Sequence, residues 1–325
     1  MINLQNLQDI LSDPKIDEAV LSENQDFFTE LCQHSPGHIL RDQYLPAPWQ
    51  AWLARHPSVE LRQSTANNPC LLREIIERLA KDDDAGVRDA VAGNLNTPPE
   101  ILSQLATDHV RNVRLHVARH RQTSSDTLLG LMQDPLWEVR RNVACHLNTP
   151  VEGLIHLAHD SDWRVRHCIA EHTKTPETLL IRLAQDVDSQ TRCAAVANSR
   201  FPLSHLIHLA KSEDLWLRRG VARNRCAPEF LLIHLAQDRD ESVLYDVAGN
   251  PNTPAKILSD LSQVFVVSIL VQVAKNPNTP GSALAQLAHI NDVATLANVA
   301  THPNASKEVR QLALEKKAYL SRDYL

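Results

Sequence analysis

Arginine is the residue whose spacing in this chain most invites chemistry. Seven arginines recur at one fixed interval along the sequence, and they are Arg62, Arg88, Arg114, Arg140, Arg166, Arg192 and Arg218. A row of guanidinium groups could bind phosphates, because each group presents paired N–H donors in a fixed plane. Aspartate recurs at the same interval, so the arginines could instead form ion pairs inside the protein.

The aspartates distinguish between these two interpretations. Five of them precede an arginine by six positions, giving the pairs Asp82/Arg88, Asp108/Arg114, Asp134/Arg140, Asp160/Arg166 and Asp186/Arg192. Two later junctions keep one partner (Ser212/Arg218 and Asp238/Leu244), and two are apolar at both positions (Val264/Leu270 and Ile290/Leu296). Hydrocarbon can replace a buried ion pair at little cost, whereas a solvent-facing phosphate contact would more often become polar. We therefore expect buried Arg–Asp pairs between successive repeats.

A second group of residues has the composition of a protein-binding surface. Trp137 and Trp163 are separated by the same interval as the arginines, and the equivalent positions elsewhere hold residues as different as Ala85 and Arg111. Aromatic and arginine side chains at variable positions are typical of interaction hot spots. The alternative is that the indole rings only cover the ends of neighbouring helices. The candidate partner-binding patch consists of Trp137, Trp163, Trp216, Arg119, Arg141, His167, Arg219 and Arg223.

Metal binding and catalysis find less support. His116 and His120 have the i, i+4 spacing of two metal ligands, but His120 holds a position that is asparagine in most repeats, so we expect it to end a helix. The six cysteines include no C-x-x-C pair and no zinc-finger spacing, and they are expected to be free thiols. The chain also lacks a glycine-rich phosphate loop, G-x-S-x-G and H-E-x-x-H. The sequence predicts a protein that is not an enzyme, with no catalytic residues, cofactor or metal.

A 26-residue repeat must position all these side chains. Each unit can be numbered from one residue, here called the register residue. The register residues are Leu61, Val87, Val113, Val139, Val165, Thr191, Leu217, Val243, Ile269 and Thr295. Stretches such as "VRDAVAGN", "TRCAAVAN" and "LRRGVARN" begin at them and place apolar residues at helical spacing. A fixed period of this length indicates a solenoid, in which each unit buries its apolar face against its neighbours.

Local signals divide each unit into two short helices. An aspartate three positions before the register residue is expected to cap the first helix, at Asp84, Asp162, Asp188, Asp214, Asp240 and Asp292. The Asn or His after "VRxxVA" is expected to end that helix, with Asn in the left-handed conformation. In the Thr-Pro pairs that follow, Thr is expected to be the N-cap and Pro the first helical residue. Glu100 and Glu152 would then complete capping boxes.

The pattern "VRxxVAxNxNTPxxxLxxLAxDxD" resembles the leucine-rich repeat variant family and, more broadly, short HEAT-type repeats. The resemblance covers roughly residues 61–305. It implies an all-α superhelix, or α-solenoid, of 26-residue two-helix repeats with no β-sheet. The prototype of this family also carries an iron–sulfur cluster held by clustered cysteines near its N-terminus. Only Cys32 lies before residue 60 here, so no cluster is expected.

Three segments are predicted. Residues 1–60 form a helical cap with a degenerate repeat, in which Trp49 and Trp52 supply aromatic mass. Residues 61–305 form a solenoid of ten units, and residues 306–325 form a capping helix. Caps are needed because the ends of a solenoid would otherwise expose apolar surface.

Charge and hydropathy bound the function. The net charge is −6. Residues 1–34 hold seven acidic residues and one lysine, so the rest of the chain is neutral, which is unusual for a nucleic-acid-binding protein. The longest apolar stretch, "VFVVSILVQVA", is too short to span a bilayer, and the N-terminus lacks the features of a signal peptide. We therefore expect a cytoplasmic protein that makes no membrane contact.

The leading hypothesis is a non-enzymatic scaffold that binds a protein partner along its curved surface. One alternative is a HEAT-like protein that binds nucleic acid through a concave face lined by Arg and His. A second alternative is an enzyme on a HEAT-like scaffold, acting for example on a tetrapyrrole or a modified base. The acidic N-terminal segment is expected to be a fixed cap, or else a mobile segment that covers the Arg/His patch.

Overall fold

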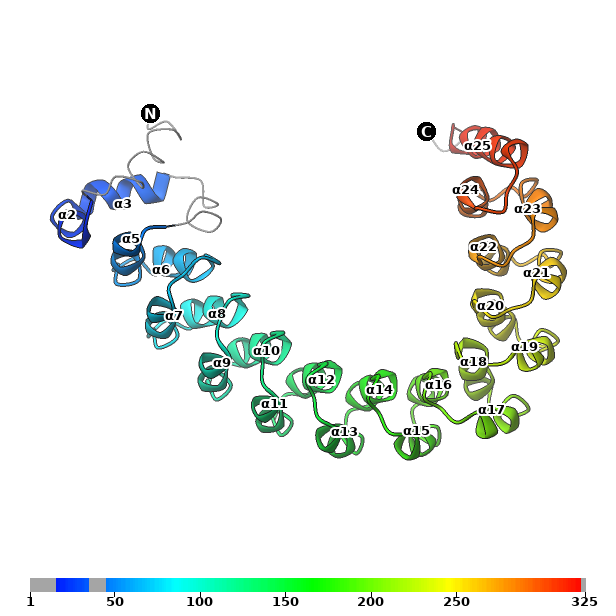
Figure 1. The fold of residues 1–325 in the computed structure, drawn as a ribbon, viewed down its shortest axis with the longest axis horizontal. Coiled ribbons are helices and arrows are strands. Elements are labelled where there is room, and N and C mark those ends of the chain that lie inside the picture. Colours follow the sequence, from blue (N-terminus) through cyan, green and yellow to red (C-terminus); the bar gives the residue numbers. More distant parts are fainter. Residues whose placement is uncertain (1–15, 35–44, 323–325) are drawn as a thin grey trace. The chain divides into compact units, whose positions relative to one another are not determined.

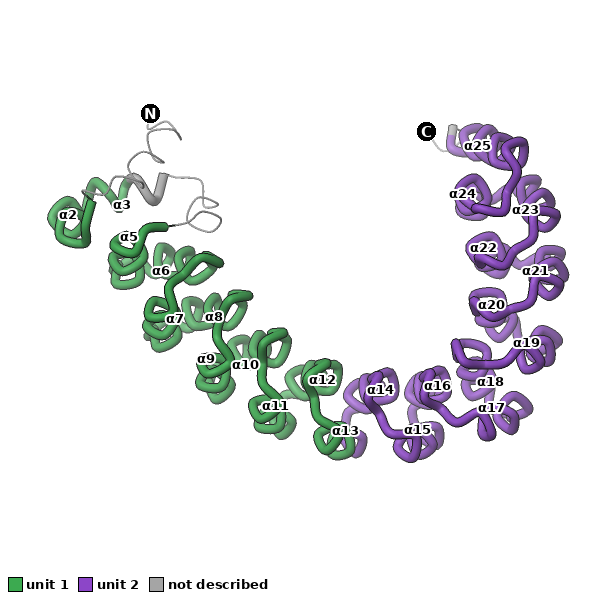
Figure 2. The backbone as a smooth tube through the Cα atoms, in the orientation of Figure 1, with its two compact units in different colours: residues 1–157 green, residues 158–325 purple. Residues whose placement is uncertain are grey.

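The computed structural model describes residues 16–34 and 45–322, which form helices and no strands. The chain divides into two compact units, residues 1–157 and 158–325 (Figure 2). The first unit contains α2 (Glu18–Glu23), α3 (Gln25–His34), α5 (Ala47–Leu53), α6 (Val59–Ala66), α7 (Arg73–Leu79), α8 (Ala85–Gly93), α9 (Pro99–Leu105), α10 (Arg111–Arg119), α11 (Ser125–Leu131), α12 (Trp137–Cys145) and α13 (Val151–Leu157). The second contains α14 (Trp163–Glu171), α15 (Glu177–Leu183), α16 (Ser189–Ala197), α17 (Leu203–Leu209), α18 (Leu215–Arg223), α19 (Glu229–Leu235), α20 (Glu241–Gly249), α21 (Ala255–Leu261), α22 (Val267–Lys275), α23 (Gly281–Leu287), α24 (Val293–Thr301) and α25 (Lys307–Arg322).

Each unit is built from two layers of short helices (Figure 1). In the first unit α6, α8, α10 and α12 pack on one another in sequence, and in the second α14, α16, α18, α20, α22 and α24 do the same. The shorter helices that follow all of these except α24 form the other layer, and α24 is followed by the 16-residue α25. This arrangement is an α-solenoid, so the predicted fold class is confirmed for the described residues. Within those ranges, none of the helices combines the length and the apolar character needed to cross a membrane.

Buried aliphatic side chains hold the two layers together. In the repeat that starts at Val87, the side chains of Val87, Val91, Leu102 and Leu105 are buried. Spacings of three and four positions place them on the face of each helix that meets the other layer. Burial of one such side chain contributes about 1.5–3 kcal/mol. Because each helix is so short, its apolar face is covered only when neighbouring repeats are present.

An aromatic cluster covers the first repeat. Trp49 and Trp52 of α5 are buried with Leu21 and Phe28 from α2 and α3. The Phe28 and Trp49 rings meet edge to face with their centroids 5.3 Å apart, a geometry that aromatic quadrupoles favour. The predicted aromatic mass therefore lies where a cap needs it, whereas the segment boundaries at residues 60 and 305 remain predictions.

The aspartate N-caps are confirmed at all six predicted positions. Each carboxylate accepts a hydrogen bond from a backbone N–H of the first helical turn, at Asp84, Asp162, Asp188, Asp214, Asp240 and Asp292. These bonds satisfy donors that the first turn of a helix would otherwise leave unpaired.

The asparagine that ends each first helix works differently from the prediction. None of the described residues has a positive φ, so the left-handed conformation is wrong for this position. Asn250 is extended, with φ −75° and ψ 127°. Its amide donates to the carbonyl oxygens of Ala222 (2.7 Å) and Asn224 (2.9 Å) in the preceding repeat, and its Oδ1 accepts from the N–H of Asn252. The side chain therefore joins two successive repeats as well as ending the helix.

Histidine fills the same position by making equivalent bonds. His120 Nε2 lies 2.9 Å from the carbonyl oxygen of Asn94, and His120 Nδ1 accepts from the N–H of Gln122. This pattern requires the neutral Nε2–H tautomer. Both ring nitrogens are occupied, so His120 is no metal ligand, and His116 Nδ1 lies 2.7 Å from Asp89 Oδ1. Among the described residues, no cluster of three His, Cys, Asp or Glu could hold a metal ion.

The Thr-Pro pair also differs from its predicted role. The N-cap of α9 is Pro98 rather than Thr97, and it makes no side-chain capping bond. The Thr97 hydroxyl instead donates to the carbonyl oxygen of Val91 at 2.6 Å. Proline suits the cap because its φ is fixed and its extended ψ matches the non-helical N-cap. The capping box at Glu100 is therefore wrong, and this carboxylate pairs with Arg73.

The arginine row is an internal ladder, as predicted, but its partners are shifted by one repeat. Arg88 donates from Nε and Nη2 to the Asp108 carboxylate near the end of its own repeat, and from Nη1 to the carbonyl oxygens of Asp82 and Asp83 in the preceding repeat. The side chains of Arg88 and Asp108 are 10% and 7% exposed. Equivalent pairs are Arg62–Asp82, Arg114–Asp134, Arg166–Asp186 and Arg218–Asp238. The predicted pairing of Arg88 with the Asp82 carboxylate is thus wrong, since only the Asp82 backbone meets Arg88.

With these partners, the positions at which later repeats lack the arginine or the aspartate follow a simpler pattern. Ser212 occupies the acceptor position for Arg192, and Asp214, two positions later, accepts the guanidinium in its place. After the charged Arg218–Asp238 pair, the following two pairs of equivalent positions are Leu244/Val264 and Leu270/Ile290, and both are apolar. Both charges of a pair are therefore present or absent together.

Hydrogen bonding outweighs burial in setting the charge of the ladder. Burial disfavours the ionised carboxyls of Asp82, Asp108, Asp186 and Asp238, but bonds from arginine and backbone N–H groups lower the pKa of each below its ordinary value. The bond to aspartate likewise raises the pKa of Arg62, Arg88, Arg114, Arg166 and Arg218. Both partners stay charged at neutral pH.

A pH effect follows from His120. Burial lowers the pKa of this imidazole, so the unfolded state binds a proton more readily than the native state does. Its contribution to stability is present above the ordinary histidine pKa of about 6.5 and is lost as pH falls through the native pKa. We expect His120→Asn to lose less stability than the wild type between pH 7.5 and 5, as measured by urea unfolding. Equal losses in both proteins would contradict this role.

The cysteines differ in state. Cys70, Cys193 and Cys226 are free. Cys145 and Cys168 are disulfide-bonded, so the expectation of free thiols is wrong for these two residues.

Candidate partner-binding groove

The second unit contains a groove whose floor is α16. The side chains of Cys193, Ala194 and Ala197 form this floor. One wall is α14, which carries His167 and Glu171, and the other is α18, which carries Arg219 and Arg223. The groove has a volume of about 750 Å³. It exists because Cys193 and Ala197 stand at positions that hold His167 and Glu171 in the preceding repeat and Arg219 and Arg223 in the next one.

A glycine lets one wall approach the floor closely. A Cβ atom on Gly220 of α18 would lie 2.7 Å from Val196 Cβ and 2.8 Å from the Cys193 carbonyl oxygen. Real side chains do not tolerate such contacts, so α16 and α18 can pack at this distance only with glycine. The close packing brings the cationic side chains of α18 next to the small residues of α16.

Trp216 and Arg219 form the rigid part of the α18 wall. The Arg219 guanidinium lies over the Trp216 ring, 5.0 Å from its centroid, which is a cation–π geometry. Arg219 Nε donates to Asp246 Oδ2 of α20 at 2.7 Å, and the Asp246 side chain is buried. The guanidinium is thus held both by an aromatic face and by a carboxylate.

Burial and ion pairing oppose each other around Asp246. Burial raises the pKa of the Asp246 carboxyl, although Arg219 and Arg223 favour its ionised form. Burial also disfavours the charge of Arg219, but the bond to Asp246 leaves the pKa of Arg219 raised. The pair therefore fixes the direction of Arg219 within the groove wall.

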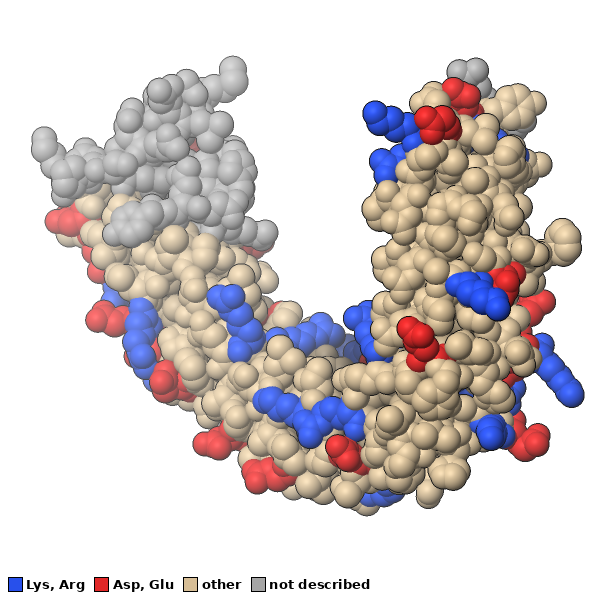
Figure 3. All heavy atoms as spheres, turned by 45° about the vertical axis from the view of Figure 1, so that its right-hand side comes forward, with Lys and Arg blue, Asp and Glu red and all other residues tan. Residues whose placement is uncertain are grey.

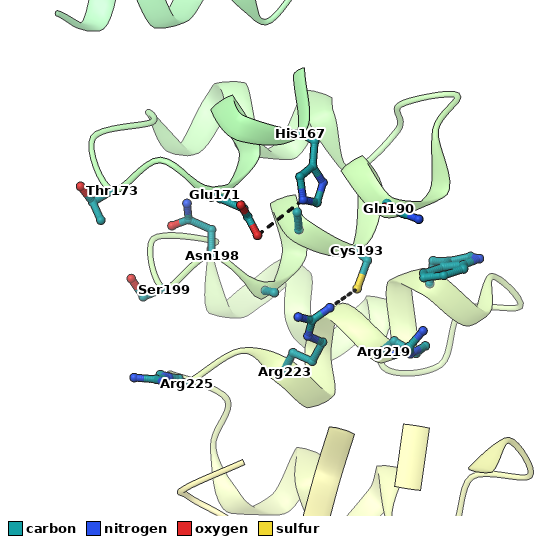
Figure 4. A pocket seen from close by; sticks show the side chains of 13 residues that line it. His167, Glu171, Thr173, Gln190, Cys193, Asn198, Ser199, Arg219, Arg223 and Arg225 are labelled. Carbon is teal, nitrogen blue, oxygen red and sulfur yellow. Dashed lines mark hydrogen bonds and ion pairs between the residues drawn. The ribbon is translucent and has the colours of Figure 1, made fainter. Parts of the chain in front are cut away.

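Arg223 is the cation that reaches into the groove (Figure 4). Its side chain is 52% exposed, its Nε lies 4.0 Å from Asp246 Oδ1, and its Nη1 lies 3.9 Å from Cys193 Sγ. Neither contact is a short charge-assisted bond, so most of its N–H donors remain available. Burial raises the pKa of the Cys193 thiol, which makes it a poor nucleophile at neutral pH.

The opposite wall is formed by His167 and Glu171 of α14. His167 Nε2 lies 3.5 Å from Glu171 Oε1 (Figure 4). The His167 ring also meets the Trp163 ring at a centroid distance of 6.2 Å. His167 Nδ1 is buried and has no hydrogen-bond partner among the described residues. This wall thus carries one acidic group opposite the arginines of α18.

Half of the predicted patch comes together in this groove. His167, Trp216, Arg219 and Arg223 line it, and Trp163 packs behind His167 without lining it. Trp137 and Arg141 lie on α12 and Arg119 lies on α10, all in the first unit. Arg119 and Arg141 are exposed and Trp137 is half-buried. Whether any of these residues binds a partner remains a prediction.

Several residues that line the groove or hold its walls were absent from the predicted patch. Asp246 follows Arg219 by one repeat and one position, and the equivalent position elsewhere also bonds to the preceding repeat, as Gln272 does to Tyr245 at 2.7 Å. That recurring cross-repeat pair is a signal the sequence contains. The small residues in "TRCAAVAN" also mark the floor, but they predict a groove only when neighbouring helices are known to stack alongside.

The groove has the chemistry of a binding site. Three arginines (Arg219, Arg223 and Arg225) and one glutamate line it, together with an aromatic ring. The Cys193 thiol is buried with a raised pKa and contacts Arg223 Nη1, so it is not an activated nucleophile. The arginine donors and the Trp216 ring can hold a ligand.

Comparisons with known proteins agree with this repeat architecture. Residues 111–136 match the model of the leucine-rich repeat variant family, and these residues span one 26-residue unit. The resemblance predicted from the repeat motif is therefore confirmed at the level of the repeat. No curated protein matches the chain.

Solved structures give weak similarities. A leucine-rich repeat variant with a novel repetitive structural motif is 24% identical, with a TM-score of 0.47, covering 68% of this chain and 87% of its own. An engineered protein is 16% identical with a TM-score of 0.32, covering 91% and 98%. Importin beta is 14% identical with a TM-score of 0.30, covering 92% and 47%.

Proposed function

We propose that this chain is a non-enzymatic repeat scaffold that binds a protein partner through the α14–α16–α18 groove. The observation that supports the proposal is that Trp216, Arg219 and Arg223 lie together on one wall of a groove of about 750 Å³. Aromatic and arginine side chains dominate the energetics of protein interfaces. The groove is lined by variable positions of α14, α16 and α18, while the repeating positions of these helices serve in packing.

The arginine ladder bears on the nucleic-acid alternative. Six of its members, such as Arg166 and Arg218, are paired with carboxylates and largely buried. They are therefore poor phosphate ligands. On the face in view in Figure 3, Lys and Arg occur in small groups separated by uncharged surface. Phosphate-backbone binding instead favours many available cations in a continuous row.

The function can be tested by comparing two double variants of the full chain. Trp216→Ala with Arg223→Ala removes the groove chemistry, and Phe230→Ala with Arg239→Ala likewise removes one aromatic and one arginine side chain, from exposed positions elsewhere in the second unit. Each protein would be used as bait in lysate of the source cells, with quantitative mass spectrometry. We expect partners that the groove variant loses by tenfold or more and the control variant retains. Equal recovery by both variants would refute a partner site in the groove.

A further inference from the structure

We infer that the groove recognises an acidic linear peptide, whose carboxylates bind Arg223 and Arg225 and whose adjoining side chain packs on Trp216. This inference rests on the proposed function and adds the chemistry of the partner. The next observations concern only the described residues of the second unit.

The groove carries more positive than negative side chains, so it favours an anionic ligand. Asp246 neutralises Arg219 through a 2.7 Å bond, and it lies 4.0 Å from Arg223. Arg225 is exposed and has no ion-pair partner among the described residues. Only Glu171, on the opposite wall, carries a negative charge in the groove lining, and it lies beside His167. Two guanidinium groups therefore remain able to form bidentate bonds with carboxylates.

The groove also offers sites for uncharged parts of a peptide. Gln190, Asn198 and Ser199 supply polar groups around the apolar floor of Cys193 and Ala194. Trp216 presents a half-buried ring that Arg219 holds in place from one side. A ring fixed in this way provides contact area without losing side-chain freedom on binding. A short extended peptide can therefore place one side chain on Trp216 and neighbouring carboxylates near α18.

A peptide fits these observations better than a nucleic acid does. The arginines of the groove are confined to α18 and the following loop, because the positions of α20 equivalent to Arg219 and Arg223 hold Tyr245 and Gly249. A nucleic-acid strand would need cations along several successive repeats to follow its phosphates. One acidic wall facing one basic wall suits instead a ligand with localised charge.

The experiment is a selection from a display library of short random peptides on the full chain. We expect the selected peptides to be enriched in Asp and Glu. For a selected peptide labelled with a fluorophore, anisotropy should show binding weakened about tenfold when its Asp and Glu become Asn and Gln. Arg223→Ala and Arg225→Glu should each weaken binding by a similar factor, and Arg239→Glu, at an exposed position away from the groove, should not. Rising salt should weaken binding as well.

The outcomes separate this inference from the proposed function. Selected peptides without acidic enrichment that still require Trp216 would overturn the acidic-peptide inference and leave the groove as a protein-binding site. Peptides that bind all variants equally would refute both. A single-stranded oligonucleotide that binds more tightly than the peptides and depends on Arg225 would assign the groove to nucleic acid. A concentration-dependent dimer lost in Arg225→Glu would assign it to a second copy of this chain, and either result would overturn the inference.

Discussion

Replacing Arg88 alone with methionine is expected to lower the free energy of unfolding by about 3–5 kcal/mol, the cost of leaving a buried charge without its partner. Arg88 and Asp108 are 10% and 7% exposed, so water screens the remaining carboxylate poorly. The substitution also removes donors from the carbonyl oxygens of Asp82 and Asp83. Urea unfolding followed by circular dichroism measures the loss.

The informative control is the double variant Arg88→Leu with Asp108→Val. The chain itself carries Leu244 and Val264 at the equivalent positions two units from Arg192. A buried pair replaced by packed hydrocarbon is often neutral or stabilising, so the double variant should regain most of the stability lost by Arg88→Met. If it is instead less stable than either single change, the apolar junctions do not substitute for the ion pair, and our account of their covariation is wrong.

Replacing Asn250 with leucine is expected to cost about 3 kcal/mol, because three hydrogen bonds worth about 1 kcal/mol each are lost and the carbonyl groups of the buried residues Ala222 and Asn224 lose these donors. Asn250 is 2% exposed and bonds Ala222, Asn224 and Asn252. Two of these bonds hold the preceding repeat, so hydrogen exchange should rise on both sides of the substitution. Chemical unfolding of the full chain gives the magnitude.

Asn250→His is the matched control for this position. His120 shows that an imidazole can donate to the previous repeat and accept from the backbone two positions on. We expect this variant to retain most of the stability at pH 7.5. A loss as large as that of leucine would show that the position selects for size or shape rather than for hydrogen bonding.

These framework positions separate architecture from recognition. The ladder arginines and the Asn/His side chains hold successive repeats by bonds to backbone carbonyl groups of the preceding repeat. Positions between them are free to vary, and in α16 and α18 they combine small residues with Trp216 and Arg223. A repeat scaffold can therefore acquire a binding groove by changing residues that do not set the stacking of its helices.

The sequence contained part of the candidate site. Trp216, Arg219 and Arg223 are visible as unusual residues at variable positions of one repeat. Asp246 was not predicted because its role depends on a contact with Arg219 of α18, one repeat earlier in the chain. The groove floor was not predicted because a small residue in isolation indicates packing as readily as a cavity.

The 26-residue period by itself determined the repeat architecture, the helical character and the aspartate caps of this protein. These features depend on apolar spacing and on bonds between near neighbours in the sequence, so local chemistry is sufficient. Only the tertiary structure decided that Arg88 meets Asp108, that Asn250 reaches back to Ala222, and that Thr97 bonds backwards to Val91. Because the sequence repeats, an arginine such as Arg88 has equivalent aspartates on either side of it, Asp82 and Asp108. Only the packing of the helices decides which carboxylate it reaches.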